Sequence, residues 1–265
     1  MNQKEMSEKN RIGWSQFTYE AWKRRHGSPK QYAKKLKENP EKPIRYYLDE
    51  VGEVRGKRIL NLLGSKGNKA VCFALLGADV TVVDISPENQ RYALELADEA
   101  GVFISYLVSD ALDIDENELS TFDIIILEMG VLHYFLDLHP LFYKVAKLMD
   151  ETSIFILRDY HPFISKVLDF ENGTLAAERD YFNDDCVEVA VAYTHLLTEK
   201  QRRDLKNNVI RRWTISGTIN ALINSGLSIR KMNEDKGIRW AFPRNSPNNI
   251  ENRLPGTYAI LSSLK

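Results

Sequence analysis

Cysteine is scarce in this sequence, and its two cysteines lie far apart. Cys72 and Cys186 form no Cys-x-x-Cys pair. A zinc site or a disulfide framework needs more cysteines at closer spacing. Cys72 falls in an apolar helical pattern, so we expect it to be a core residue. This cysteine usage fits a reducing compartment, and we expect a cytoplasmic protein.

Long hydrophobic runs and an excess of one charge are also missing. No segment approaches the roughly 18 apolar residues that cross a bilayer, and the first ten residues, MNQKEMSEKN, lack the apolar core of a secretion signal. The chain has 36 basic and 37 acidic residues, a net charge of −1, which does not favour nucleic acid as the default partner. We expect neither a membrane nor nucleic acid as partner. The oligomeric state stays open.

The most regular feature that is present is an alternation of strands and helices from about residue 57 to 158. Apolar stretches predict strands at 57–63, 79–84, 102–108, 122–128 and 153–159. Strands that are apolar on both faces are typical of a parallel sheet covered by helices on each side. Residues 211–235 predict a helix and a strand, and 254–264 predict a last strand in an antiparallel hairpin. We therefore expect an α/β fold: a doubly wound, seven-stranded, mostly parallel sheet with an antiparallel last strand.

Two segments lie outside this alternation. Residues 1–50 predict a helical N-terminal cap whose anchors are aromatic: Trp14, Phe17, Tyr19 and Trp22. Residues 51–265 predict the main domain, with an insertion at about 161–210. A segment this long between core elements is more often a functional lid than an idle loop.

Polar residues and glycines follow the first four predicted strands. Gly64 and Gly67 follow the first strand, Asp84 ends the second, Asp110 follows the third and Glu128 ends the fourth. The carboxyl ends of parallel strands share one rim of a sheet, where ligands of such folds bind. Glycines allow close backbone approach to a ligand, and a carboxylate can accept hydrogen bonds from a ribose diol. Together these residues indicate a nucleoside-type ligand.

A dinucleotide is the obvious competing ligand. The nicotinamide fingerprint is GxGxxG, whereas the corresponding loop reads LLGSKGNKA, with its two glycines three residues apart. No stretch of ordinary dehydrogenase size is left for a second substrate domain. A nicotinamide-dependent oxidoreductase is therefore disfavoured.

Four motifs at these spacings resemble the class I S-adenosylmethionine-dependent methyltransferases, whose fold is Rossmann-like. They are ILNLLGSKG, VTVVDIS, VSDALDI and FDIIILEMGVLHYF, and the resemblance covers roughly residues 57–160, with the C-terminal strands as the last part of the fold. The stretches HYF, LRDY and YHPF further resemble a bacterial subgroup of small-molecule type. The resemblance implies an enzyme with S-adenosylmethionine as cofactor and S-adenosylhomocysteine as product.

The resemblance also implies a role for each residue of these motifs. Gly64, Ser65 and Gly67 would line the methionine part of the cofactor, and Asp84 would hold the ribose hydroxyls. Ile85 would lie against the adenine, whose edge Asp110 and Ala111 would bind. Glu128 and Met129 would line the site near the sulfonium.

The first motif departs from the pattern of the class. That pattern is acidic-x-Gly-x-Gly-x-Gly, but here Asn61 replaces the acid, Leu63 the first glycine and Ser65 the second. Asn61 can accept a hydrogen bond from the cofactor, yet it lacks the charge to pair with the ammonium of the methionine group.

Methyl transfer from a sulfonium is an in-line displacement in which the leaving group needs no proton, so alignment can supply much of the catalysis. A general base helps where the acceptor is a hydroxyl or an ammonium. His133, after the fourth strand, is the candidate base, and Tyr160 and His161 are second candidates. Trp22 and Tyr134 complete the substrate or lid candidates. Arg211, Arg212 and Trp213, predicted at the start of the late helix, are candidates for binding an acidic acceptor.

Several acceptor classes are disfavoured by the sequence. The (Asp/Asn)-Pro-Pro-aromatic run of DNA amino methyltransferases is replaced by LEMGVLHYF. No carboxylate cluster has metal-ligand spacing, so we expect no metal. The predicted cap and lid favour a small-molecule acceptor. The alternative is a non-catalytic binding module that keeps the fold and acts through a partner.

Overall fold

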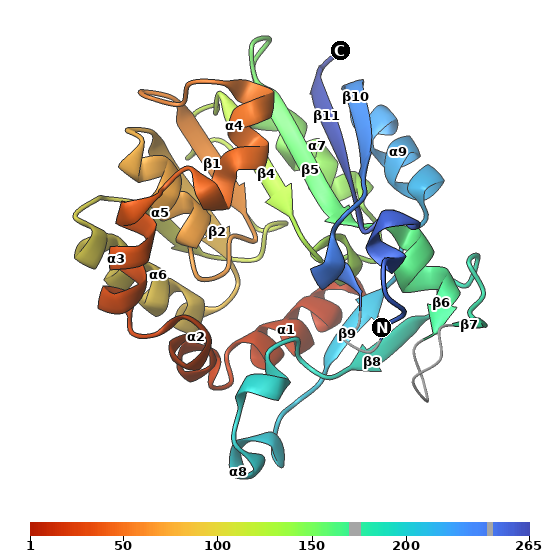
Figure 1. Ribbon diagram of the computed structural model, residues 1–265. Helices are drawn as coiled ribbons and strands as arrows, with labels where there is room; N and C mark the ends of the chain where they lie inside the picture. The colour runs from red at the N-terminus through yellow and green to blue at the C-terminus, as the bar shows by residue number, and fades with distance from the viewer. Residues whose placement is uncertain (170–175, 243–245) are drawn as a thin grey trace.

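The computed structural model describes residues 1–169, 176–242 and 246–265. Its centre is a seven-stranded sheet in the order β10-β11-β5-β4-β1-β2-β3 (Figure 1). β11 pairs antiparallel with both β10 and β5, and all the other pairs of neighbouring strands are parallel. The predicted doubly wound, mostly parallel sheet with an antiparallel last strand is confirmed. The strands are β1 (Arg58–Leu62), β2 (Asp79–Asp84), β3 (Ser105–Val108), β4 (Ile124–Glu128), β5 (Ile154–Tyr160), β10 (Leu227–Asp235) and β11 (Thr257–Leu264).

The central strands are apolar because both of their faces are covered. β1 lies between β2 and β4, with Leu62 opposite Val83 on one side and Leu127 on the other. These three side chains are at most 2% exposed. Since the three strands are parallel and in this register, their carboxyl ends lie side by side, and the loops that follow them meet at one rim.

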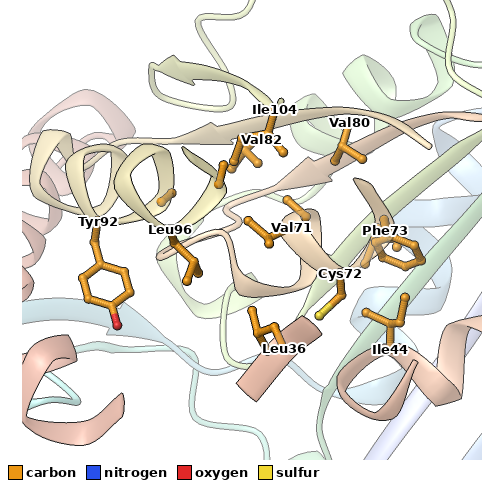
Figure 2. Packing of buried hydrophobic residues seen from close by; sticks show 14 of the residues in the cluster. Leu36, Ile44, Val71, Cys72, Phe73, Val80, Val82, Tyr92, Leu96 and Ile104 are labelled. Carbon is orange, nitrogen blue, oxygen red and sulfur yellow. The ribbon is translucent and has the colours of Figure 1, made fainter. Parts of the chain in front are cut away.

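Helices from the two halves of the chain cover opposite faces of the sheet. On one face lie α3 (Pro29–Glu38), α5 (Asn68–Leu75) and α6 (Pro87–Ala100), whose packing against Val80 and Val82 is shown in Figure 2. On the other face lie α7 (His139–Lys147) and α9 (Ile215–Asn224). Burial of large aliphatic and aromatic side chains on both faces, about 1.5–3 kcal/mol each, stabilises the sheet from both sides.

The N-terminal helices lie beside the carboxyl-end rim. They are α1 (Gln3–Trp14), α2 (Thr18–His26) and α4 (Arg45–Val51), the last following the short helix η1 (Lys42–Ile44). Trp14 stacks on Trp22, with 6.5 Å between ring centroids, and lies 5.5 Å from Tyr193. Phe17 differs from the expected anchor, because its side chain is 40% exposed and its backbone is left-handed.

The segment after β5 contains short elements rather than irregular chain. They are the π-helix η3 (Phe163–Val167), β6 (Leu168–Asp169), β7 (Ala176–Ala177), β8 (Cys186–Val189), η5 (Thr194–Leu196), α8 (Glu199–Arg202) and β9 (Asn208–Arg211). Residues 170–175 of the expected lid lie outside the described residues. The late helix does not begin at Arg211, which ends β9. It begins after Thr214, whose side chain accepts from the N–H of Gly217.

One buried asparagine joins the N-terminal helices to this segment. Asn10 is 3% exposed. Its amide donates to the carbonyl of Val209 (2.9 Å) and accepts from the N–H of Val209 (2.8 Å). A single side chain thereby satisfies both backbone groups of a residue 199 positions away. Tyr193 adds a second connection, because its hydroxyl donates to the carbonyls of Gly13 and Gln16. Within the described ranges, no helix is both long and apolar enough to cross a membrane.

We expect Asn10→Ala to destabilise the protein by about 2 kcal/mol, because two buried backbone groups lose their partners. Chemical denaturation measures the loss. Asn224→Ala, at an exposed position on α9, is the control and should change stability by at most about 0.5 kcal/mol. An equal effect of both substitutions would show that α1 is not held by Asn10.

Candidate active site

A cavity of about 410 Å³ lies at the rim where the strands end. Its wall combines the loops after β1, β2, β3, β4 and β5 with side chains of α1 and α2. Most of the residues that the sequence predicted for the site line it: Trp22, Gly64, Ser65, Asp84, Ile85, Asp110, Ala111, Glu128, Met129, Tyr134 and Tyr160. Asn61, Gly67, His133 and His161 are not among its lining residues. Eleven of the predicted site residues therefore line the cavity, and the other four lie outside its wall.

The loop after β1 adopts left-handed backbone at two residues that are not glycine. Leu63 and Ser65 have φ of 48° and 50°. Gly64 between them is required by close packing, since a Cβ there would lie 2.7 Å from Val82 and 2.8 Å from the amide oxygen of Asn61. Left-handed residues other than glycine cost about 1–3 kcal/mol each and occur mainly at functional sites. The loop therefore has an energetically unfavourable backbone conformation at the cavity wall.

Gly67 has a packing role at the start of α5. Its φ is 68°, and a Cβ there would lie 2.7 Å from the Cβ of Ala93 on α6. A larger residue would separate α5 from α6. Gly67 therefore sets the position of the helix that follows the loop and does not line the cavity.

Asp84 ties the loop after β1 to the loop after β2. Its carboxylate accepts from the N–H of Ser65 (2.9 Å), the N–H of Ser86 (3.0 Å) and the side-chain amide of Asn89 (3.0 Å). Burial raises the pKa of Asp84, and these hydrogen bonds oppose that rise. A carboxylate can accept about four hydrogen bonds, so capacity remains for a ligand in the cavity. Asp110 closes its own loop in a similar way, accepting from the N–H of Leu112 (2.9 Å).

Asn89 connects Asp84 to the N-terminal helices, a role that the sequence did not reveal. Its amide oxygen accepts from the indole N–H of Trp22 at 2.8 Å. Trp22 and Asn89 both line the cavity, and Asn89 is 1% exposed. The position of α2 is therefore coupled to the buried carboxylate through one side chain.

Glu128 is held by two partners inside the protein. It accepts from the hydroxyl of Tyr47 and pairs with Lys69. Burial, followed by the charge of Glu128, raises the pKa of Tyr47 well above its ordinary value. The ion pair with Lys69 neutralises Glu128, so this carboxylate presents little net charge to a ligand.

A second buried carboxylate, Asp159 on β5, holds the loop after β4. It is 6% exposed and accepts from the N–H groups of Gly130 (2.5 Å), Leu132 (3.3 Å) and Tyr160 (2.7 Å). This loop contains the left-handed Met129, with φ of 61°. The signal in the sequence was an acid near the end of a strand that is otherwise buried, but its spacing did not show which amides it would meet.

The two histidine candidates lie outside the cavity wall. His133, on η2 (Leu132–Tyr134), contacts the ring of Tyr134 at 4.3 Å between centroids. Burial, with a smaller effect of the nearby Arg212, lowers the pKa of His133 to about 4. His161 contacts Glu234 through Nε2 at 2.8 Å, and its Nδ1 accepts from the N–H of Phe163.

Comparison with known proteins shows a match to one family model and to solved structures of the same fold. Residues 62–157 match the family model described as a methyltransferase domain. No curated protein matches the chain. Many solved structures share its fold, among them three methyltransferases at low sequence identity.

The first of these structures is an S-adenosylmethionine-dependent methyltransferase from Mesorhizobium loti (22% identity, 84% of this chain and 97% of that one, TM-score 0.62). The second is such a methyltransferase from Clostridium acetobutylicum (17%, 83% and 89%, TM-score 0.57). The third is magnesium protoporphyrin IX methyltransferase from Synechocystis PCC 6803 with bound SAH (12%, 98% and 99%, TM-score 0.58).

The matched domain and the sheet order confirm the predicted class. Residues 62–157 form a methyltransferase domain, and the chain around them has the class I fold. The prediction of an enzyme is confirmed at that level, and the third structure, which has the same fold, contains bound SAH. Within the described part of the chain, no group of three or more His, Cys, Asp and Glu side chains is placed to hold a metal ion.

We expect Asp159→Ala to lower the free energy of unfolding by about 3 kcal/mol, since three backbone N–H groups lose their acceptor and each unmet buried donor costs about 1–3 kcal/mol. Urea denaturation measures the loss. Asp98→Ala, an exposed position on α6, is the matched control. A loss no larger than that of the control would contradict the role given to Asp159.

His133 predicts a pH dependence of stability. Its pKa is about 4 in the folded protein and about 6.5 in the unfolded chain. As the pH falls from 6.5 to 4, the unfolded chain binds the proton first, so stability is lost on acidification. At pH 5 this amounts to about 1–2 kcal/mol. His133→Gln should therefore show a shallower fall in melting temperature between pH 7 and 5. Parallel curves for both proteins would contradict the buried, neutral His133.

Proposed function

We propose that the cavity binds S-adenosylmethionine and that the enzyme transfers its methyl group to a small-molecule acceptor. The observation that carries this proposal is the Asp84 carboxylate, which lines the cavity and also fixes the left-handed loop at Ser65. A ligand with a ribose diol would find an acceptor for its hydroxyls at this rim, beside the backbone of the loop after β1.

The cavity offers a complementary group for each part of the cofactor. The backbone of Gly64 and Ser65 would hold the methionine part, and Asp84 would accept from the ribose hydroxyls. Ile85 and Ala111 provide apolar contact for the adenine, and Asp110 provides an acceptor for its amine. Glu128 and Met129 would lie near the sulfonium. Asn61, buried behind Gly64, supports the shape of the loop.

Catalysis in this proposal depends mainly on alignment. When bound, the cofactor supplies a methyl group activated by the sulfonium, which leaves without needing a proton. The chain holds the acceptor in line with that methyl and excludes water. His133 remains the candidate base. With its pKa lowered to about 4, it is neutral at pH 7 and able to accept a proton, but only weakly basic.

The N-terminal helices favour a small acceptor. We propose that residues 1–50 act as a cap on a main domain of residues 51–265, with the insertion at about 161–210 as a lid. Trp22 of α2, Tyr134 of η2 and Tyr160 at the end of β5 all line the cavity. The third structural neighbour acts on magnesium protoporphyrin IX, also a small molecule. The free thiols Cys72 and Cys186 fit the proposed cytoplasmic location.

One observation favours the alternative, a binding module that works through a partner. The motif acid is replaced by Asn61, whose side-chain nitrogen is buried with no hydrogen-bond partner among the described residues. The methionine end therefore lacks the carboxylate that would pair with an ammonium. A folded protein with no affinity for the cofactor would favour this alternative.

The test is calorimetric titration with S-adenosylmethionine and S-adenosylhomocysteine. We expect binding by the wild type and a loss of roughly ten- to a hundredfold in Asp84→Asn, because hydrogen bonds to a charged group contribute about 1.5–3 kcal/mol. Asp98→Asn, away from the cavity, should bind like the wild type. If neither ligand binds to the folded wild type, the proposed function is wrong.

A further inference from the structure

Two cations on the cavity wall have no anionic partner. Lys66, in the loop after β1, and Arg25, in the last turn of α2, both line the cavity. Neither forms an ion pair or a hydrogen bond with any described residue. The one contact of Lys66 is with the face of Trp22, 4.7 Å from the ring centroid. Lys69 differs from both, because it is paired with Glu128.

A third donor lies beside them. His26 lines the cavity, and its Nε2 is buried without a partner among the described residues. Burial, together with the charges of Lys66 and Arg25, lowers the pKa of His26 to about 3, so the ring is neutral at pH 7 while its Nε2 has no hydrogen-bond partner among the described residues. Its ring stacks on Tyr32 at 4.5 Å, which holds its orientation.

The two cations repel each other, and the charge of Glu128 offsets this for Lys66 only in part. Burial and the charges of Lys69 and Arg25 lower the pKa of Lys66 to about 8. Of the acids on the wall, Asp84 is engaged with three donors, Glu128 with Lys69 and Tyr47, and Asp110 with the N–H of Leu112. Lys66 is half-buried, whereas Arg25 is exposed. A half-buried charge without a partner is unfavourable, so a ligand that brings negative charge would stabilise Lys66.

The proposed cofactor does not bring that charge. Its ammonium and carboxylate cancel, and its sulfonium adds one positive charge. With the cofactor bound, the wall formed by Arg25 and Lys66 would still carry an excess of positive charge. A methyl acceptor that carries an anionic group would supply the negative charge that Arg25 and Lys66 lack.

Two aromatic side chains line the same cavity. Tyr160 and Trp240 pack edge to face, with 5.9 Å between ring centroids, and they are 37% and 57% exposed. Burial raises the pKa of Tyr160 and the charge of Arg25 lowers it in part, and both residues line the cavity. An exposed tryptophan at a cavity offers a flat apolar surface to a planar ligand.

We propose, resting on the proposed function, that the methyl acceptor is an aromatic acid. Its carboxylate is held by Arg25, Lys66 and His26, and its ring lies against Tyr160 and Trp240. The carboxylate serves as the handle, and the nucleophile is a hydroxyl or amino group of the same molecule. A lone pair of that group forms the bond to the methyl carbon as the sulfur–carbon bond breaks with its electron pair on sulfur. The acceptor then loses its proton to water or to a base.

The experiment pairs acids with their uncharged amides. The protein is first titrated with S-adenosylhomocysteine and then, saturated with it, with benzoate, 3-hydroxybenzoate and 4-aminobenzoate. Benzamide, 3-hydroxybenzamide and 4-aminobenzamide are the matched neutral probes. We expect at least one acid to bind at least about tenfold more tightly than its amide, as for other charge-assisted contacts.

Substitutions then test whether Arg25 and Lys66 cause the preference for the acid over its amide. Arg25→Gln and Lys66→Gln should each remove most of the preference for the acid, whereas Trp240→Ala should weaken the acid and its amide alike. Lys23→Gln is the charge-matched control, since Lys23 is exposed on α2 and does not line the cavity. It should retain the preference.

Three results would overturn the inference while leaving the proposed function intact. One is equal affinity for acids and amides, and another is no binding of any of the six probes, in protein that binds S-adenosylhomocysteine. The third is a loss of S-adenosylhomocysteine affinity in Arg25→Gln and Lys66→Gln with the acid preference unchanged, which would assign these cations to the carboxylate of the cofactor. Failure to bind S-adenosylhomocysteine would instead overturn the proposed function, and this inference with it.

Discussion

The cavity depends on buried carboxylates that accept hydrogen bonds from backbone amides of the loops beside them. Asp84 fixes the left-handed Ser65 in this way, and Asp159 fixes Gly130 next to the left-handed Met129. A carboxylate needs several donors when it is buried, and a loop in an unfavourable conformation needs acceptors for its amides. The loop amides supply the donors that the buried carboxylate needs, and the carboxylate supplies the acceptor that the amides need. The loops are therefore held in their ligand-facing shape before any ligand arrives, which lowers the cost of binding.

The sheet could be predicted from the sequence because its signals are local. The strands near 79–84 and 124–128 are recognised by their β-branched and aliphatic residues, and the helices between the strands indicate a parallel sheet. The segment at 161–210 gave no such signal. β8 and β9 are four residues each, and β9 is fixed by Asn10 from the other end of the chain. A start of the late helix at Arg211 was wrong for the same reason, since pairing with β8 keeps that residue extended.

The site could be predicted only as far as it follows from strand ends. Asp84, Asp110 and Glu128 were found because each comes at or just after the end of a strand. Asn89 and Asp159 were missed because their roles depend on which amides and indoles surround them in space. The charge that a side chain presents to a ligand also depends on neighbours in space that the sequence does not reveal. In the sequence Glu128 looks like a free acid, yet Lys69 neutralises it and Tyr47 donates a hydrogen bond to it. The unpaired Arg25, in contrast, lies in a stretch that looks like an ordinary basic helix end.

The loop after β1 has left-handed backbone at two positions where the motif of the class has glycine and this chain does not. Where the class has glycine, this chain has Leu63 and Ser65, and both still adopt the left-handed backbone that glycine favours. Glycine makes that conformation cheap, but neighbours can impose it on other residues: here the N–H of Ser65 is held by Asp84, and Gly64 packs against Val82 and Asn61. The left-handed backbone at Leu63 and Ser65 is thus held by contacts with residues outside these two positions. A departure from the pattern at these two positions changes the stability of the loop more than its shape, whereas the change from acid to Asn61 alters the charge that a ligand meets.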